Sequence, residues 1–265
     1  MVDANGATVS TEQELAEEFN AFFTTVFTKE DASSVPSLQH LFCQYGELSD
    51  VHVDNQVVRK KLDKLRYDKA PGADDMHPRC LKEIAEEICS PLTMILRKSL
   101  DQGVIPEDWR MANVSPIFKK GCRSEASNYR PVSLTSQVCK IYESILRDAI
   151  IDHLVKNQLI RDSQHGFLRG RSCLSNLLIF LDKVTECVDR GVDVDVIFFD
   201  FAKAFDKVPH ARLMNTVRAH GVKGLVANWI ENWLKDRKQR VCIRGAGSTW
   251  IEVSSGVPQL SLIHI

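Results

Sequence analysis

The acidic residues Asp200 and Asp206 have the types and spacing that could do chemistry. Asp200 follows the apolar run VIFF (196–199) and precedes Phe201. An ionised carboxylate among apolar residues is costly unless a cation or a hydrogen-bond donor meets it. Mg²⁺ binds one or two carboxylates and completes its shell with water and phosphates, so Asp200 is a candidate magnesium ligand. The alternative is that Asp200 caps the turn after a strand, and the strand alone favours that alternative.

Asp206 follows shortly after, with Phe205 directly before it. We interpret Asp206 as structural, because a short carboxylate accepts hydrogen bonds from the first amides of a helix, and a helix is expected near Pro209. Phe205 is predicted either to belong to the core or to wall the same cleft as Asp200.

Basic residues cluster in the middle of the chain. The segments are PIFKKG (116–121), NYRPVSL (128–134) and QHGFLRGRSC (164–173). Lys119, Lys120 and Arg130 flank a short polar loop, as in a β-hairpin that presents cations to phosphates. Arg169 and Arg171 flank a glycine turn that could approach a nucleic-acid backbone. The alternative is a solvated charged loop, which such runs usually are.

The elements that must position these residues follow from apolar spacing and from breaker residues. A capping box of Ser10 and Gln13 is expected to begin the first helix, and Pro91 is placed at a helix start. Helices are predicted over 11–27, 54–66, 78–88, 91–102, 136–158, 173–189, 209–219 and 223–235. Strands are predicted over 110–118, 194–201, 239–244 and 248–253. Their irregular alternation favours an α+β fold over a doubly wound sheet.

Composition and charge leave nucleic-acid binding open. The 265 residues are 44% hydrophobic and 26% charged with a net charge of −1, which excludes a disordered polyelectrolyte. Residues 110–172 carry a net charge of +6. The N-terminal residues 1–109 are acidic, so the net charge of the whole chain does not reveal this basic region. The eight cysteines show no C-x-x-C spacing, which argues against a zinc site. With no signal peptide or membrane span apparent, we expect an intracellular protein of the cytoplasm or nucleus with no membrane partner.

Several motifs occur in an order that resembles one family. They are KAPGADDMHP (69–78), VIPEDWRMANVSPIFKKG (104–121), NYRPVSL, QHGFLRGRSC, FFDFAKAFDKV (198–208) and SSGVPQ (254–259). Together they resemble the reverse transcriptase of LINE-type, non-long-terminal-repeat retrotransposons of the jockey-like or chicken-repeat-like kind. One such motif is weak evidence, whereas the ordered series makes a chance match implausible.

The resemblance implies an RNA-directed DNA polymerase, a nucleotidyltransferase that uses an RNA template, a DNA primer and deoxynucleoside triphosphates. It implies a right-hand fold with fingers and a partial palm, a helix-rich N-terminal segment and no thumb. The expected division is 1–50 linker with a helix, 51–190 fingers-like region, 191–259 partial palm and 260–265 non-native tail.

The resemblance also assigns residues to roles. Asp200 would be the first catalytic aspartate holding two Mg²⁺ ions, assisted by the backbone carbonyl of Phe201. Phe205 would be the steric gate under the incoming sugar. The nucleotide would further meet Lys119, Arg130 and Gln259, and nucleic acid would meet Lys120, Arg169 and Arg171.

Departures from the family pattern predict an inactive fragment. Ala73 stands where the family has Pro, Asp75 where it has Gly, and Leu260 where it has Gly. The second carboxylate pair of the family's Y/F-A-D-D motif is not in the chain. The alternatives are a non-catalytic nucleic-acid-binding remnant and a translated remnant with no evolved role.

The final residues, LSLIHI (260–265), are expected to be foreign to the element. They are also the translation of CTGTCTCTTATACACATC, which resembles a transposase end sequence used as a library adapter.

Overall fold

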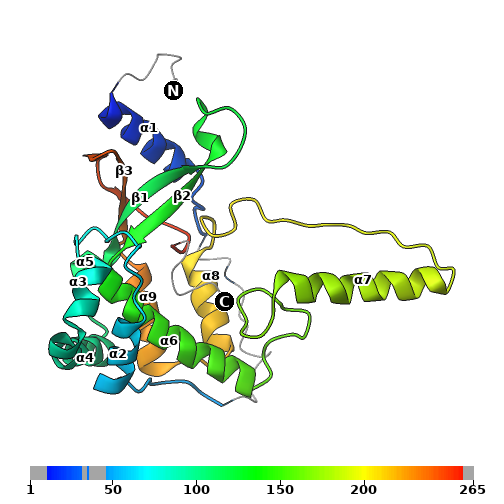
Figure 1. Cartoon of the computed structure of the whole chain (residues 1–265), viewed down its shortest axis with the longest axis horizontal. Helices are drawn as coiled ribbons and strands as arrows, with labels where there is room; N and C mark the ends of the chain where they lie inside the picture. The colour runs from blue at the N-terminus through cyan, green and yellow to red at the C-terminus, as the bar shows by residue number, and fades with distance from the viewer. Residues whose placement is uncertain (1–10, 32–34, 36–45, 259–265) are drawn as a thin grey trace.

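The computed structural model describes residues 11–31, 35 and 46–258. Its described part has a helical body with a small sheet above it, and an arm that projects sideways (Figure 1). The chain is therefore a mixture of helices and a small mixed sheet, in agreement with the expected class.

The helical body is built on four helices: α2 (Asn55–Asp63), α4 (Ala85–Gln102), α6 (Gln137–Lys156) and α9 (Gly224–Leu234). The short helices α3 (Pro78–Glu83) and α5 (Glu107–Arg110) pack beside them. Tyr142, Trp229 and Trp233 are fully buried at the centre. The rings of Tyr142 and Trp229 meet edge to face at 4.9 Å, a geometry that adds to the stabilisation from burial.

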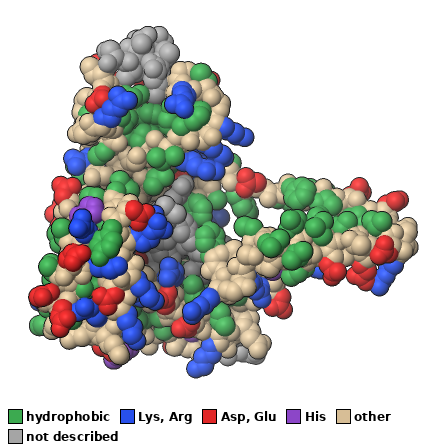
Figure 2. Space-filling model, viewed as in Figure 1, with side chains coloured by type: hydrophobic (Ala, Val, Ile, Leu, Met, Phe, Trp, Pro, Cys, Tyr) green, Lys and Arg blue, Asp and Glu red, His purple; other side chains and the backbone are tan. Residues whose placement is uncertain are grey.

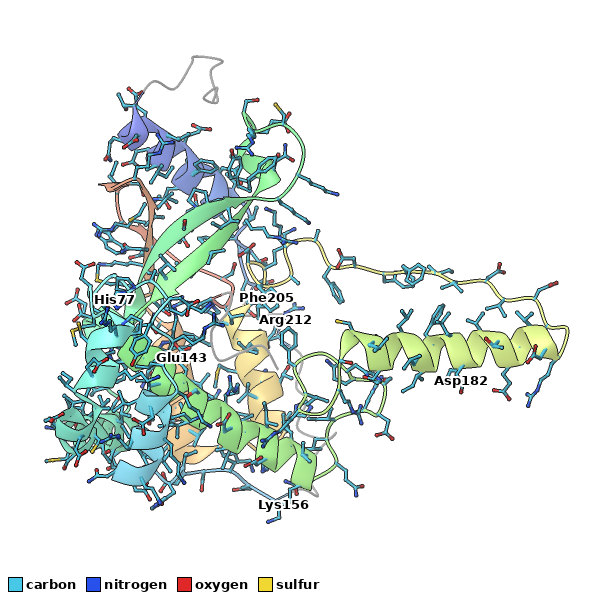
Figure 3. The ribbon with its side chains drawn as sticks, viewed as in Figure 1. His77, Glu143, Lys156, Asp182, Phe205 and Arg212 are labelled. Carbon is cyan, nitrogen blue, oxygen red and sulfur yellow. The ribbon has the colours of Figure 1, made fainter. Side chains whose placement is uncertain are left out.

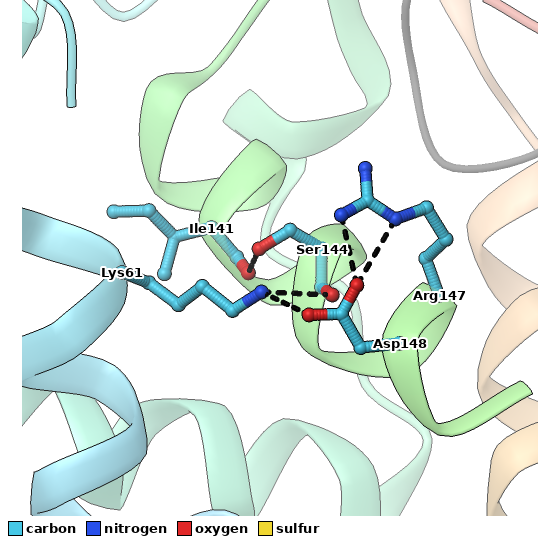
Figure 4. A network of polar contacts seen from close by, with 5 residues as sticks. All are labelled: Lys61, Ile141, Ser144, Arg147 and Asp148. Carbon is cyan, nitrogen blue, oxygen red and sulfur yellow. Dashed lines mark hydrogen bonds and ion pairs between the residues drawn. The ribbon is translucent and has the colours of Figure 1, made fainter. Parts of the chain in front are cut away.

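A polar contact ties α2 to α6 (Figure 4). Lys61 pairs with Asp148 and donates to the carbonyl of Ser144 at 3.3 Å, while Arg147 contacts the other oxygen of Asp148 at 2.8 Å. Partial burial acts to raise the pKa of Asp148. The two cations outweigh it, so the pKa lies below its ordinary value.

The sheet has the order β2-β1-β3-β4 among the described strands, and β5 also pairs with β3. Its strands are β1 (Met111–Phe118), β2 (Tyr129–Thr135), β3 (Lys238–Ile243), β4 (Ala246–Gly247) and β5 (Ile251–Glu252). β1 and β2 form an antiparallel hairpin, whereas β1 and β3 run parallel. The hairpin is thereby joined to the C-terminal part of the chain.

Helix α1 (Glu12–Thr25) lies against this sheet. Phe19 and Phe23 pack on Val114 and Val241 in a second apolar cluster. The capping box at its start consists of Thr11 and Glu14, so the prediction of Ser10 and Gln13 is wrong by one residue. The side chains of Gln13 and Asn20 donate to the carbonyls of Gly247 and Thr249 at 2.8 and 2.9 Å.

The arm consists of α7 (Cys173–Asp189) and an extended return over 191–201, followed by α8 (His210–Ala219). The bounds of α7 agree with the predicted helix, yet none of its residues, all of them described, is buried. Figure 2 shows hydrophobic side chains gathered along the arm. They include Leu174, Leu177, Leu178, Leu181 and Val188.

The strand predicted over 194–201 is wrong, because this stretch has no regular secondary structure. Phe198 and Phe199 are 85% and 92% exposed. A strand exists only where its amides and carbonyls meet a neighbouring strand. Among the described residues no strand lies beside this segment, so its β-branched residues give an extended chain and nothing more.

Two smaller predictions also differ from the structure. Pro91 lies inside α4 rather than at a helix start. Its position is exposed, so water can reach the carbonyl that loses its usual donor to the proline. Of the strand expected over 248–253 only Ile251–Glu252 (β5) is a strand, and β4 (Ala246–Gly247) lies before the expected range. Within the described residues no helix combines the length and apolarity needed to cross a membrane.

Candidate active site

The structure brings together two of the motifs that were expected to share a site. The amide of Val257 donates to the carbonyl of Phe205 at 2.9 Å, and the amide of Gly256 donates to Val208 at 2.8 Å. The hydroxyl of Ser255 donates to the carbonyl of Asp206 at 2.8 Å. The segment after Asp200 and the loop before Gln259 are therefore held as one unit.

Gly256 is required for this close approach. Its φ is +86°, and a Cβ there would lie 2.7 Å from the carbonyl oxygen of Phe205 and 2.8 Å from that of Asp206. A side chain would thus push the two segments apart in addition to straining the backbone.

Asp206 does not cap the following helix, and that prediction is wrong. The N-cap of α8 is Pro209, which offers no side-chain acceptor. The side chain of Glu30 accepts from the amides of Ala211 and Arg212 instead, at 2.9 and 3.1 Å. The sequence rule selected a nearby carboxylate, whereas the acceptor comes from the N-terminal part of the chain.

Asp206 instead faces a recess between α1, β2 and β3. One of its carboxylate oxygens is buried without a hydrogen-bond partner among the described residues. Burial raises the pKa of Asp206, and Lys203 offsets only part of that effect. The recess has about 30 Å³ of room, enough for a water or two and far too little for a nucleotide. It is therefore a structural feature of the site rather than a substrate pocket.

Arg237 lines the same recess, and sequence reasoning missed it. It lies directly before β3, with its guanidinium over the ring of Trp233 at 5.1 Å. Burial lowers the pKa of Arg237 to about 10, against the opposing effect of Glu143 on α6, so it stays charged at neutral pH. In the sequence it stands among Lys235, Asp236 and Lys238, and nothing there distinguishes it from a surface cation.

Asp200 and Phe201 lie on the exposed return of the arm. Asp200 makes no hydrogen bond or ion pair with the described residues. No group of three potential metal-ligating side chains occurs within those ranges either. A two-metal site holds its ions about 4 Å apart and needs several carboxylates. The described residues therefore do not fit a pair of metal ions. Asp200 supplies a single exposed carboxylate.

Lys119, Lys120 and Arg130 lie together at the far end of the β1–β2 hairpin. The amide of Lys119 donates to the carbonyl of Asn128 at 2.8 Å, and Arg130 stands opposite Ile117 in the register. All three side chains are exposed, and none forms an ion pair within the described residues. Phe205 lies at the N-terminal end of α8, on the side of the body that carries the hairpin (Figure 3).

Arg169 and Arg171 lie in the loop between α6 and α7. Arg169 is exposed. The guanidinium of Arg171 instead holds its own loop, donating to the carbonyl of Gln164 at 2.7 Å and pairing with Asp162 at 3.3 Å. A nucleic-acid contact by either residue stays a prediction. Gln259 and the predicted tail Leu260–Ile265 fall outside the described residues.

The described residues thus combine a hairpin that ends in exposed cations with an aspartate-bearing segment that is hydrogen-bonded to a glycine loop. Residues 117–259, more than half of the chain, match the family described as reverse transcriptase (RNA-dependent DNA polymerase). The chain belongs to that family, whose members generally use divalent metal ions.

Curated relatives agree with this assignment. The chain is 27% identical over 76% of its length to a probable RNA-directed DNA polymerase from transposon BS of Drosophila melanogaster. It is 23% identical over 99% of its length to the probable enzyme from transposon X-element of the same species. It is 26% identical over 78% of its length to the enzyme from the mobile element jockey. These alignments cover 22%, 30% and 22% of the relatives, so the chain spans less than a third of their length. The predicted resemblance to the reverse transcriptase domain of non-long-terminal-repeat retrotransposons is confirmed.

Proposed function

We propose that this chain is the fingers and part of the palm of an RNA-directed DNA polymerase that binds an RNA template paired with a DNA primer. The carrying observation is the exposed trio of cations at the end of the β1–β2 hairpin, for which the described residues provide no carboxylate partner. Unpaired cations on a rigid hairpin suit phosphates, because Arg forms a bidentate fork and Lys a point charge.

The roles within the site follow from position. Lys119 and Arg130 contact the triphosphate of the incoming nucleotide, and Lys120, Arg169 and Arg171 contact nucleic acid. Phe205 is the steric gate beneath the sugar, and Gln259 lies near the nucleotide and the template. Asp200 and the carbonyl of Phe201 supply the first magnesium ligands of a two-ion site that other carboxylates must complete.

The chain as given is proposed to be catalytically inactive. No group of three potential metal-ligating side chains occurs among the described residues, and Asp200 lies on an irregular segment that pairs with no described strand. Purified chain with primer, template and Mg²⁺ or Mn²⁺ should incorporate deoxynucleotides only at background level. Template-dependent extension would contradict this part of the proposal.

The binding proposal is tested through its salt dependence. Each phosphate contact contributes about 0.9 to the slope of log affinity against log salt for a duplex. The double variant Lys119→Ala/Arg130→Ala should lower the slope on an RNA–DNA hybrid by up to about 1.8. The control Lys98→Ala/Lys156→Ala removes as much charge from exposed positions on α4 and α6 and should leave the slope unchanged. Equal slopes in both variants would mean that Lys119 and Arg130 do not contact phosphates and belong to a solvated charged loop.

A further inference from the structure

The N-terminal segment reaches the candidate active site at several points. Phe22 on α1 lies beneath the ammonium of Lys203, with 5.5 Å between the nitrogen and the ring centroid. The hydroxyl of Thr28 donates to the carbonyl of Lys207 at 3.1 Å. Both partners belong to the segment that runs from Asp200 into α8.

A second link passes through the glycine loop. The amide of Thr28 donates to the hydroxyl of Ser255 at 2.8 Å, and that hydroxyl donates in turn to the carbonyl of Asp206. Ser255 is almost fully buried, so water does not compete for these bonds. One hydroxyl therefore joins three parts of the chain that are far apart in the sequence.

The third link is the strongest by its chemistry. The side chain of Glu30 uses both carboxylate oxygens to accept the amides of Ala211 and Arg212, in the first turn of α8. It also lies 4.0 Å from the guanidinium of Arg212 and is only 17% exposed. A carboxylate at this end of a helix satisfies amides that have no partner within the helix and complements the helix dipole. Pro209 at the N-cap supplies neither effect.

We propose that residues 27–31 form a strap that fixes the segment from Phe205 to Arg212 and the loop at 255–257, with Glu30 as its positioning residue. The strap acts on Phe205 through the backbone, because Phe205 lies in the turn at 202–207. Thr28 holds the end of that turn, and Glu30 holds the first amides of α8 that follow it. Figure 3 shows Phe205 and Arg212 at the same end of α8. The positioning of a nucleotide by Phe205 rests on the proposed function, whereas the strap itself rests on the contacts above.

Hydrogen exchange of the 265-residue chain tests the strap. Loss of a helix cap typically changes local stability by an amount equivalent to about fivefold in the exchange rate. In Glu30→Gln, amides over 204–212 and 255–257 should therefore exchange about fivefold faster, while those of α4 and α9 keep their rates. Glu30→Asp keeps the charge and should restore part of the protection. The control Glu18→Gln makes the same charge change on α1, at a residue whose side chain forms no hydrogen bond or ion pair with the described residues, and should change nothing.

Two outcomes would overturn the proposal. Unchanged exchange over 204–212 would show that Glu30 positions nothing, and uniform acceleration across the chain would make it a general contributor to stability. If Glu30→Gln does not fold, Thr28→Val removes only the bond to Lys207 and should accelerate exchange around that residue alone; unchanged exchange there would count against the strap. Binding of an RNA–DNA hybrid should be equal in Glu30→Gln and the unaltered chain. Failure of the unaltered chain to bind the hybrid would reject the proposed function and leave the exchange result standing.

Discussion

The helical body and the arm have similar apolar sequences and opposite degrees of burial. In α9 the repeat of apolar residues places Trp229 and Trp233 at zero exposure against α4 and α6. In α7 an equally regular repeat leaves Leu174 at 63% and Leu178 at 57% exposure. The difference shows that apolar spacing defines which face of a helix is to be covered, whereas the covering partner comes from elsewhere in the fold.

The largest expected effect is a difference between the two regions in how much a substitution lowers the free energy of unfolding. Trp229→Ala should lower the free energy of unfolding by about 3–5 kcal/mol, because it opens a cavity in a packed core. Phe199→Ala in the arm should change it by less than about 0.5 kcal/mol, because that ring is already in solvent. Urea unfolding followed by circular dichroism measures both. Similar losses in the two variants would mean that the arm is packed in solution.

A smaller effect concerns glycines in the two regions. Gly256 in the body and Gly170 at the root of the arm have φ values of +86° and +77°. A Cβ at Gly256 would meet the carbonyl of Phe205, whereas within 4 Å of one at Gly170 there is nothing among the described residues. Gly170→Ala should destabilise by about 1 kcal/mol from backbone strain, and Gly256→Ala by about 1–3 kcal/mol more. Equal losses of stability in the two variants would mean that the loop at 255–257 can move away from Phe205 at little cost in free energy.

The smallest expected effect on stability lies on α7. Leu177→Gln/Leu181→Gln should change the free energy of unfolding by less than about 0.5 kcal/mol. The same variant should bind less of a hydrophobic dye and self-associate less in sedimentation, because exposed apolar patches drive both. Lys183→Gln/Glu186→Gln, at polar positions of the same helix, is the matched control and should leave dye binding unchanged. Unaltered dye binding in the leucine variant would show that the patch is covered.

Local signals predicted much of this fold. Sequence patterns predict the hairpin strand at 111–118, the long helix α6 and both ends of α7. They do so because the capping, spacing and breaker residues lie within each element. The segment 194–201 was mispredicted because a strand depends on a neighbour that no local pattern contains.

The candidate site was predictable only where its contacts are local in the sequence. The hydrogen bond from the amide of Val257 to the carbonyl of Phe205 joins two motifs that are far apart in the sequence, and no local pattern contains that contact. The acceptor for the first amides of α8 was assigned to Asp206, because sequence rules search only nearby residues. Glu30 lies 181 residues from Ala211 and could not be found in that way. Arg237 was missed for a related reason, since its burial against Trp233 depends on tertiary packing.

The docking of α1 on the last strands has a consequence for synthesis of the chain. The bond from Asn20 to Thr249 joins residues 229 positions apart, and Phe19 packs on Val241. At roughly 5–20 residues per second, a ribosome needs about 10–50 s to make the residues between them. During that interval the phenylalanines of α1 have no sheet to cover them and are open to chaperones or to neighbouring nascent chains. Helix α1 is therefore made well before the strands that it packs on, and this part of the sheet region can be completed only after Thr249 has been synthesised.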